Sequence, residues 1–300
     1  MKLLLLGKNG QVGWELQRSM SVLGEVVALD RHSRTLCGDL TNLAGLVQTV
    51  RELRPDVIVN AAAYTAVDQA EREYDLARMI NATAPQVLAQ EAQRQGAWLV
   101  HFSTDYVFDG SSQRPWGETD LPAPLNVYGQ TKLEGEQSIA ANCERHLIVR
   151  TSWVYGARGG NFIKTMLRLA REREQLTVID DQHGAPTSAE LLADATALMI
   201  HRLTACSQDE RAGLYHLTAA GETTWHGYAS HLIAEARRIH PGIELKVTNV
   251  VATTSEAFVT AATRPRNSRL DTAKLQAAFG LTLPPWQKGV DRVLAEILQH

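Results

Sequence analysis

Short runs of apolar residues alternate with longer amphipathic segments through the first half of the chain. Each short run has the length of a strand buried on both faces, and turn residues bound it. We expect these strands at residues 2–6, 26–30, 57–60, 98–103 and 147–150. The longer segments carry apolar residues at every third or fourth position, which is the spacing of helices. We expect these helices at residues 12–21, 44–53, 75–94 and 128–141.

The second half has more turn signals and shorter strand candidates. Its pattern predicts helices at residues 161–173, 188–203, 224–238 and 286–298, and strands at 177–179, 214–217 and 245–247. Alternating strands and helices predict a parallel sheet wrapped by helices, with ligands beyond the C-terminal strand ends. We expect a first domain at 1–150 and a smaller mixed domain, interleaved with it, in 151–300. Residues 175–187 and 214–247 are candidates to return to the first domain.

Composition and charge narrow the class of partner. The chain has 300 residues, of which 44% are apolar and 21% charged, and its formal net charge is −3. This charge gives no reason to expect a nucleic acid or an anionic membrane as partner. The opening apolar run ends at Gly7, and no run approaches the roughly 18 apolar residues of a spanning helix. Three scattered cysteines, Cys37, Cys143 and Cys206, suit a reducing cytoplasm and argue against a disulfide framework.

A glycine-rich segment joins the first predicted strand to the first predicted helix. Glycines at this place permit a tight turn and let a pyrophosphate approach the helix N-terminus. A turn that only packs a strand against a helix has the same spacing, but the position after the first strand favours a dinucleotide site. The cofactor-binding residues expected here are Gly7, Gly10, Gln11, Val12 and Gly13.

The end of the second strand carries two opposite charges. Asp30 can bond ribose hydroxyls and repels a 2′-phosphate, whereas Arg31 favours that phosphate. The two signals conflict, so we expect both NADH and NADPH to be accepted. Small or apolar residues near the ends of other strands let a flat cofactor lie close to the backbone. The further cofactor contacts expected are Asp39, Leu40, Ala62, Ala63, Thr65 and Phe102.

Tyr128 and Lys132 lie four residues apart on a predicted helix and therefore share one face. An adjacent cation favours the phenolate, so we expect the lysine to lower the tyrosine pKa from its ordinary value of about 10. Thr104, at the end of the fourth strand, can hold a substrate oxygen. The three residues predict reduction of a carbonyl, with Tyr128 as general acid, and Tyr128 and Lys132 are also expected to contact the cofactor.

Seven motifs in a fixed order resemble those of the extended short-chain dehydrogenase/reductases and, among them, the dTDP-4-dehydrorhamnose reductase family. The motifs occupy residues 7–16, 60–63, 103–110, 124–132, 150–155, 181–187 and 264–270. The resemblance runs nearly end to end. It implies a Rossmann-type doubly wound parallel sheet with a smaller, interleaved mixed α/β substrate domain.

The resemblance also implies an activity. It is the reduction of the C4 ketone of dTDP-4-dehydro-β-L-rhamnose, which completes dTDP-L-rhamnose for polysaccharides such as O-antigen. The substrate contacts implied are Thr104, Asp105, Trp153, Arg264 and Asn267. Related dehydratases have a glutamate after the aspartate that matches Asp105, whereas this chain has Tyr106. Dehydration is therefore disfavoured.

Glu15, Glu190 and Glu296 match positions at which some family members gather Mg²⁺ across a homodimer. Oxygen ligands suit this ion, although the three glutamates also read as ordinary exposed helix charges. The histidines show no ligand pattern and are interpreted as structural. Two alternative functions remain open: an epimerase or reductase acting on another nucleotide sugar, and an NADP-binding regulatory subunit of the methionine adenosyltransferase type.

Overall fold

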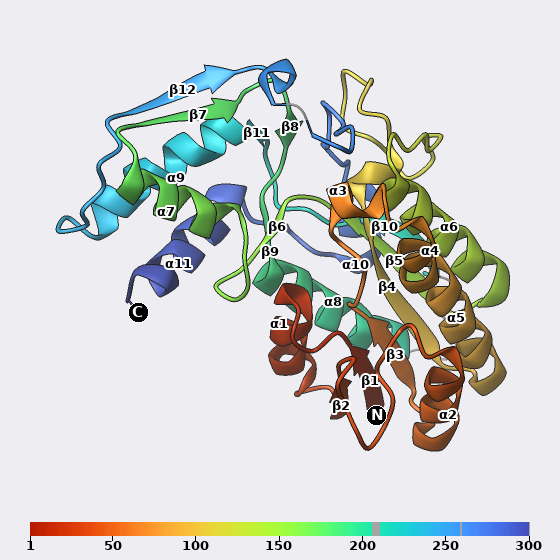
Figure 1. Cartoon of the computed structure of the whole chain (residues 1–300). Helices are drawn as coiled ribbons and strands as arrows, with labels where there is room; N and C mark the ends of the chain where they lie inside the picture. The colour runs from red at the N-terminus through yellow and green to blue at the C-terminus, as the bar shows by residue number, and fades with distance from the viewer. Residues whose placement is uncertain (206–210, 259, 300) are drawn as a thin grey trace.

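Six parallel strands form the central sheet. They are β1 (Lys2–Leu6), β2 (Glu25–Leu29), β3 (Val57–Asn60), β4 (Trp98–Thr104), β5 (His146–Thr151) and β10 (Gly213–His216). Their order is β10-β5-β4-β3-β1-β2, so the direction of winding reverses between β1 and β3 (Figure 1). A crevice for ligands forms at such a reversal. The predicted doubly wound α/β class is confirmed.

The computed structural model describes residues 1–205, 211–258 and 260–299, so Cys206 lies outside the described residues. Helices cover both faces of the sheet (Figure 1). One face carries α1 (Gln11–Met20), α8 (Ala189–Thr204) and α10 (Ala273–Phe279), and the other carries α2 (Leu43–Leu53), α5 (Ala84–Gln95) and α6 (Val127–Asn142). Leu3 points into the first layer and Leu4 into the second. This burial on both faces explains why the strands lack polar alternation.

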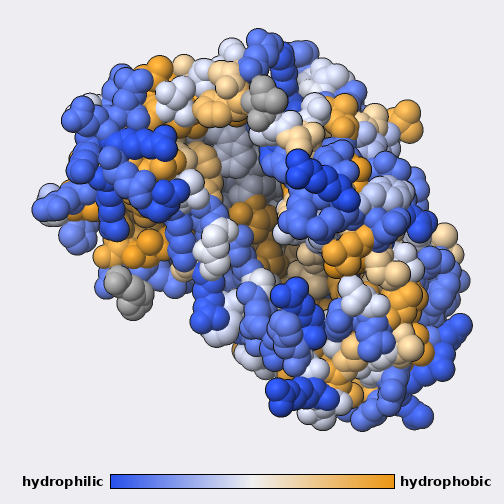
Figure 2. Space-filling model, viewed as in Figure 1, coloured by the Kyte–Doolittle hydropathy of each residue, from blue (hydrophilic) through white to orange (hydrophobic). Residues whose placement is uncertain are grey.

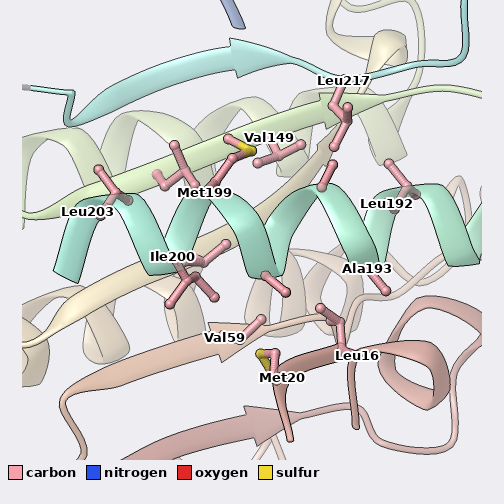
Figure 3. Packing of buried hydrophobic residues seen from close by; sticks show 14 of the residues in the cluster. Leu16, Met20, Val59, Val149, Leu192, Ala193, Met199, Ile200, Leu203 and Leu217 are labelled. Atoms are coloured by element: carbon pink, nitrogen blue, oxygen red, sulfur yellow. The ribbon is translucent and has the colours of Figure 1, made fainter. Parts of the chain in front are cut away.

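Helix α8 comes from the second half of the chain yet packs on the central sheet. Figure 3 shows its apolar side chains between the strands and helix α1, where Met199 and Leu192 are fully buried. Leu16 and Met20 of α1 belong to the same cluster. The two halves of the sequence are therefore interleaved in one hydrophobic core.

A second lobe has a hydrophobic core of its own, and Figure 2 shows a hollow between the two lobes. Its larger elements are α7 (Phe162–Glu172), α9 (Trp225–Ile239), α11 (Trp286–Gln299) and the parallel strands β7 (Gln175–Ile179) and β12 (Asn249–Thr253). Short strands pair near the junction of the lobes: β6 (Val154–Tyr155) with β9 (Thr187–Ser188), and β8 (His183–Gly184) with β11 (Thr223–Thr224). Among the described residues, no helix is long and apolar enough to cross a membrane.

Two segments considered for a return to the first domain behave differently. Strand β10 pairs with β5 in the central sheet, whereas β7 pairs with β12 in the second lobe. The prediction of a strand at 245–247 is wrong, because the strand in this region is β12, which begins at Asn249. Val247 is buried without a ladder partner, and its N–H donates to the Ala170 carbonyl. Its apolar character therefore reflects packing rather than strand pairing.

The helix expected at 75–94 is interrupted. Helix α4 (Tyr74–Arg78) leads into a π-helical turn at Met79–Thr83, and α5 follows it. The wider turn carries Asn81, which is fully buried, and its side chain bonds the backbone of Tyr64 and the Thr131 hydroxyl. Three short helices complete the description: α3 (Val67–Ala70) and the 3₁₀ turns Asp105–Val107 and Ser255–Ala257.

Candidate active site

A cavity of about 610 Å³ lies beyond the C-terminal ends of β1, β3 and β4, at the reversal of the sheet. It is lined by the glycine-rich loop, by the ends of the strands and by residues from both lobes. A second cavity of about 580 Å³ adjoins it and shares four lining residues. The shared residues are Gly7, Asn9, Ala62 and Ala63. Together the cavities form one elongated site.

The glycine-rich loop forms the floor where the cavities meet. Gly7 has a φ of +91°, and a Cβ there would lie 2.8 Å from the Ala62 nitrogen. A Cβ on Gly13 would lie 2.0 Å from the Gly7 carbonyl oxygen. Glycine is therefore required at both places, by backbone conformation at the first and by close packing at the second.

Helix α1 begins in this loop and has no side-chain cap at Gly10. In the described part of the chain, five other α-helices have one, provided by Asn42, Asn126, Asn161, Ser188 and Thr224. Gly10, Gln11 and Val12 line the first cavity at the positive end of α1. An uncapped helix start beside a cavity fits an anionic group such as a pyrophosphate.

Asp30 lies in the second cavity, where Arg31, Asp39 and Leu40 also occur. The Asn9 amide donates to the Asp30 carboxylate at 2.5 Å, which places Asp30 beside the glycine loop. Burial acts to raise the pKa of Asp30, but hydrogen bonds from the His32 backbone and Ser33 and the charge of Lys8 lower it overall. The carboxylate is thus held ionised, as a ribose acceptor requires. Ala62 and Ala63 border both cavities, while Thr65 and Phe102 line the first.

Thr104, Tyr128 and Lys132 all line the first cavity, as the sequence predicts. Burial raises the pKa of Tyr128 to about 12, and a hydrogen bond from Thr104 opposes this shift only in part. The prediction that Lys132 lowers this pKa is therefore wrong for this structure. The argument from helical spacing left out burial, which is the largest influence on the pKa of Tyr128.

Lys132 is almost fully buried, and its ammonium group turns toward β4. Its Nζ donates to the Phe102 carbonyl at 2.6 Å and lies 3.0 Å from Nε2 of His101. The other ring nitrogen of His101 is 3.1 Å from the Asn60 amide. Sequence reasoning misses His101 as a site residue, and its only signal is a polar residue inside a buried apolar run.

Asp105 lines the same cavity next to Thr104 and is 2% exposed. Burial raises its pKa to about 7, although hydrogen bonds from Ser268 and Thr104 act in the opposite direction. Its Oδ2 has no hydrogen-bond partner in the part of the chain that the structure describes. A buried, unsatisfied carboxylate oxygen is costly, which agrees with the raised pKa of this carboxyl group.

Two tryptophans form the wall that belongs to the second lobe. Trp153 has an unusual positive φ of 49° and stacks on Trp225, with ring centroids 3.7 Å apart and an interplanar angle of 14°. Both line the first cavity. A Cβ on Gly184 would lie 2.6 Å from the Trp153 ring, so glycine makes room for that ring. Trp225 is a site residue that sequence reasoning misses.

The structure places Arg264 and Asn267 outside the residues that line the cavities. Arg264 forms an ion pair with Asp68, with Nη2 2.7 Å from Oδ2. Asn267 is buried, and its amide donates to the carbonyls of Ser112 and Arg114. In this structure both side chains tie the segment at residues 264–267 to the first lobe.

Two of the three glutamates considered for a metal form ion pairs with arginines. Glu190 pairs with Arg292 at 3.0 Å, and Glu15 pairs with Arg18 at 3.5 Å. Burial raises the pKa of Glu190, Arg292 opposes this, and the charges of Glu15 and Glu296 add to it. No three histidine, cysteine or acidic side chains of the described residues are placed to hold a metal ion. A magnesium site within one chain is not supported, and a shared site in a homodimer stays a prediction.

Comparisons with known proteins find similar proteins over nearly the whole chain. The family model described as RmlD substrate binding domain matches residues 1–299. A curated dTDP-4-dehydrorhamnose reductase from Salmonella typhimurium is 57% identical over 297 residues, which are 99% of this chain and 98% of that protein.

Solved structures extend the likeness to three dimensions. A dTDP-4-dehydrorhamnose reductase from Clostridium acetobutylicum has a TM-score of 0.89 and 36% identity, with all of both chains covered. The Bacillus anthracis protein of the same name, in complex with NADP, has a TM-score of 0.86 and 38% identity. That match covers 98% of this chain and 99% of the other.

Proposed function

The chain belongs to the dTDP-4-dehydrorhamnose reductase family, and from this premise we propose that it reduces the C4 ketone of dTDP-4-dehydro-β-L-rhamnose to dTDP-L-rhamnose with NADPH or NADH. One observation carries the proposal. The glycine-rich loop and the group formed by Thr104, Tyr128 and Lys132 line the same cavity. A dinucleotide and a carbonyl compound can therefore meet in it.

The residues around the elongated site fit a nicotinamide dinucleotide. The start of α1 would hold the pyrophosphate, Asp30 the ribose, and Asp39 with Leu40 the adenine end. Arg31 in the same cavity would accommodate a 2′-phosphate. When bound, the reduced nicotinamide supplies the hydride that reaches C4. A homologue in complex with NADP supports this assignment.

Tyr128 would donate a proton to the oxygen on C4. Its pKa of about 12 keeps the phenol protonated at neutral pH, as a proton donor must be. Thr104 would hold the same oxygen through its hydroxyl and stabilise the charge that grows there. Lys132 would add positive charge near Tyr128 and Thr104 in the same cavity. Its pKa of about 8 leaves it mostly protonated at pH 7.

The sugar nucleotide would lie between the lobes. Asp105 and Trp153 line the cavity and would contact the sugar, Asp105 through its carboxyl group and Trp153 through its aromatic face. Arg264 and Asn267 stay predictions as substrate contacts. We propose residues 1–150 as the cofactor domain, joined by β10, with residues 151–300 mainly holding the sugar nucleotide. A cytoplasmic location and a homodimer are part of the same proposal.

The proposal is tested by following the loss of reduced-nicotinamide absorbance with dTDP-4-dehydro-L-rhamnose as substrate. The wild-type protein should turn over. Tyr128→Phe removes the proton donor and should lower kcat by about 100-fold or more, which is the typical contribution of general acid catalysis. NADPH binding, measured by fluorescence titration, should survive.

Tyr74→Phe is the matched control, because Tyr74 is exposed on α4 and lies outside both cavities. Near-normal turnover of Tyr128→Phe would remove the tyrosine from the acid role. Absence of turnover by the folded wild-type protein would contradict the proposed reaction. Stoichiometric NAD⁺ retained by the purified protein would favour an epimerase, and NADP binding without any turnover would favour a regulatory subunit.

A further inference from the structure

A buried group of three charges includes Lys132, one of the proposed catalytic residues. Lys132 and Glu136 are one turn apart on α6 and are 1% and 4% exposed, and Arg150 on β5 is 2% exposed. Arg150 binds the Glu136 carboxylate with both Nε and Nη2, at 2.9 and 2.6 Å. Ser103, which precedes Thr104, donates to the same carboxylate at 2.5 Å.

Such a group is expensive to bury, because each charge loses its hydration. The carboxylate pairs directly with Arg150, and Lys132 adds a second positive charge one turn away on α6. Among the described residues, Nη1 of Arg150 has no hydrogen-bond partner. Arginine does not lose its proton in proteins, whereas a buried lysine does so readily. The charge of Lys132 is therefore the variable one, and Glu136 is the anion that opposes its loss.

We propose that Glu136 is a positioning residue that keeps the buried Lys132 protonated during reduction, with Arg150 and Ser103 fixing the Glu136 carboxylate for this purpose. The inference rests on the proposed function, because it assigns a task within that reaction. Stability alone does not explain why the Glu136–Arg150 ion pair is buried here. Hydrophobic residues of similar volume often give a core the same stability as a buried ion pair, or more. The proposed role supplies a reason for the pair.

The surroundings of Lys132 support this assignment. From β4 it meets His101 and the Phe102 carbonyl. Burial and the charge of Lys132 lower the pKa of His101 well below its ordinary value, so the imidazole is neutral. Tyr128, which is a neutral phenol, and Glu136 each lie one turn from Lys132 on α6. Burial lowers the pKa of Lys132 to about 8, and Glu136 opposes that shift.

These groups predict a specific pH dependence. Tyr128 titrates only near pH 12, whereas Lys132 loses its proton near pH 8. The rate of reduction should therefore fall on the alkaline side as Lys132 is deprotonated. Removal of the anion should move this fall to lower pH, and removal of the competing cation should move it to higher pH.

The test measures kcat/KM for dTDP-4-dehydro-L-rhamnose from pH 6 to 10 in two variants. Glu136→Gln keeps an oxygen for Arg150 and Ser103 but removes the charge, so the alkaline midpoint should fall by about one pH unit or more. Arg150→Gln frees the carboxylate to act on Lys132 alone, so the midpoint should rise. Glu134→Gln is the control, because Glu134 lies on the same helix and pairs with Arg78 outside the buried group.

Opposite shifts are the decisive readout, since a merely structural role would lower the rate at every pH without moving the midpoint. Folded variants with an unmoved midpoint, or with shifts of the same sign, would overturn the proposal. Thermal melts identify the folded variants. If only one of the two variants folds, the direction in which its alkaline midpoint moves decides. Loss of folding in both would assign the ion pair to stability and overturn the catalytic role. A wild-type protein without turnover would instead contradict the proposed function.

Discussion

Burial decides the protonation of three residues at the catalytic end of the cavity. It raises the pKa of Tyr128 to about 12 and that of Asp105 to about 7, and it lowers that of Lys132 to about 8. Each shift favours the uncharged form, as desolvation does. A phenol that keeps its proton suits the reductive direction. The residues were predictable from helical spacing and strand-end position, but their pKa values were not.

Asp105 provides a test at this scale. Its folded pKa of about 7 exceeds the ordinary value of 3.8, so the stability that its proton confers is complete below about pH 4 and is lost as pH rises through 7. Asp105→Asn cannot titrate. Its free energy of unfolding should exceed that of wild type by on the order of 1–3 kcal/mol at pH 8, and the difference should shrink toward pH 4. Urea unfolding at pH 4, 6 and 8 measures it, and equal pH dependence in both proteins would contradict the assigned shift.

At the scale of elements, the strand–loop–helix unit of β1 and α1 builds the cofactor end of the site. The loop is tight because Gly7, Gly10 and Gly13 leave no side chain in its interior, and Gly10 leaves the start of α1 without a side-chain cap. Helix α6 contributes the other end by carrying Tyr128 and Lys132 on one face. Its start is fixed by Asn126, which caps the Gly129 N–H and also bonds the Thr263 carbonyl.

Gly13→Ala should disrupt the loop, because the new Cβ would overlap the Gly7 carbonyl. We expect at least a tenfold loss of NADPH affinity and a destabilisation of about 1–3 kcal/mol, which is typical of overpacking. Gly160→Ala is the control, since a Cβ there would meet no atom within 4 Å. Fluorescence titration and thermal melts measure both effects. Wild-type affinity in Gly13→Ala would show that the loop does not approach the cofactor.

At the scale of the whole molecule, segments distant in the sequence enclose the site. Helix α8 belongs to the core of the central sheet. The segment near residue 264 returns to the first lobe, where Arg264 pairs with Asp68 and the Ala262 N–H bonds the same carboxylate. Arg264 also interacts with Tyr106, which lines the cavity and packs edge-on against Tyr128. This connection holds one wall of the site in place.

Asp68→Asn and Arg264→Gln should each raise the KM for the sugar nucleotide several-fold, because each loosens the same wall. The double variant should be no worse than either single variant, since the two residues share one interaction. Arg266→Gln is the control, because that side chain is largely exposed and pairs with Glu256. A far larger effect of Arg264→Gln than of Asp68→Asn would instead indicate direct contact of the arginine with the diphosphate. Steady-state kinetics with varied sugar nucleotide distinguish the two outcomes.

The limits of sequence-based prediction follow from the range of the interactions. Strands β1 and β3 were predicted to the residue, because an apolar run between turn signals is a local pattern. The π-helical turn around Asn81 was missed, because its contacts lie at Tyr64 and Thr131. The strand expected at 245–247 was wrong because burial against α7 produces the same apolar residues as strand pairing.

The sequence by itself determined the order of strands and helices, the glycine loop and the spacing of Tyr128 and Lys132, since each depends on neighbouring residues. Only the tertiary structure decided that Lys132 turns to His101, that Glu136 shares its charge with Arg150, and that Trp225 joins Trp153 in the wall. It also decided that burial, and not the lysine, sets the pKa of Tyr128. The physical reason is that desolvation and pairing depend on which distant segments the fold brings together, and no local pattern records that.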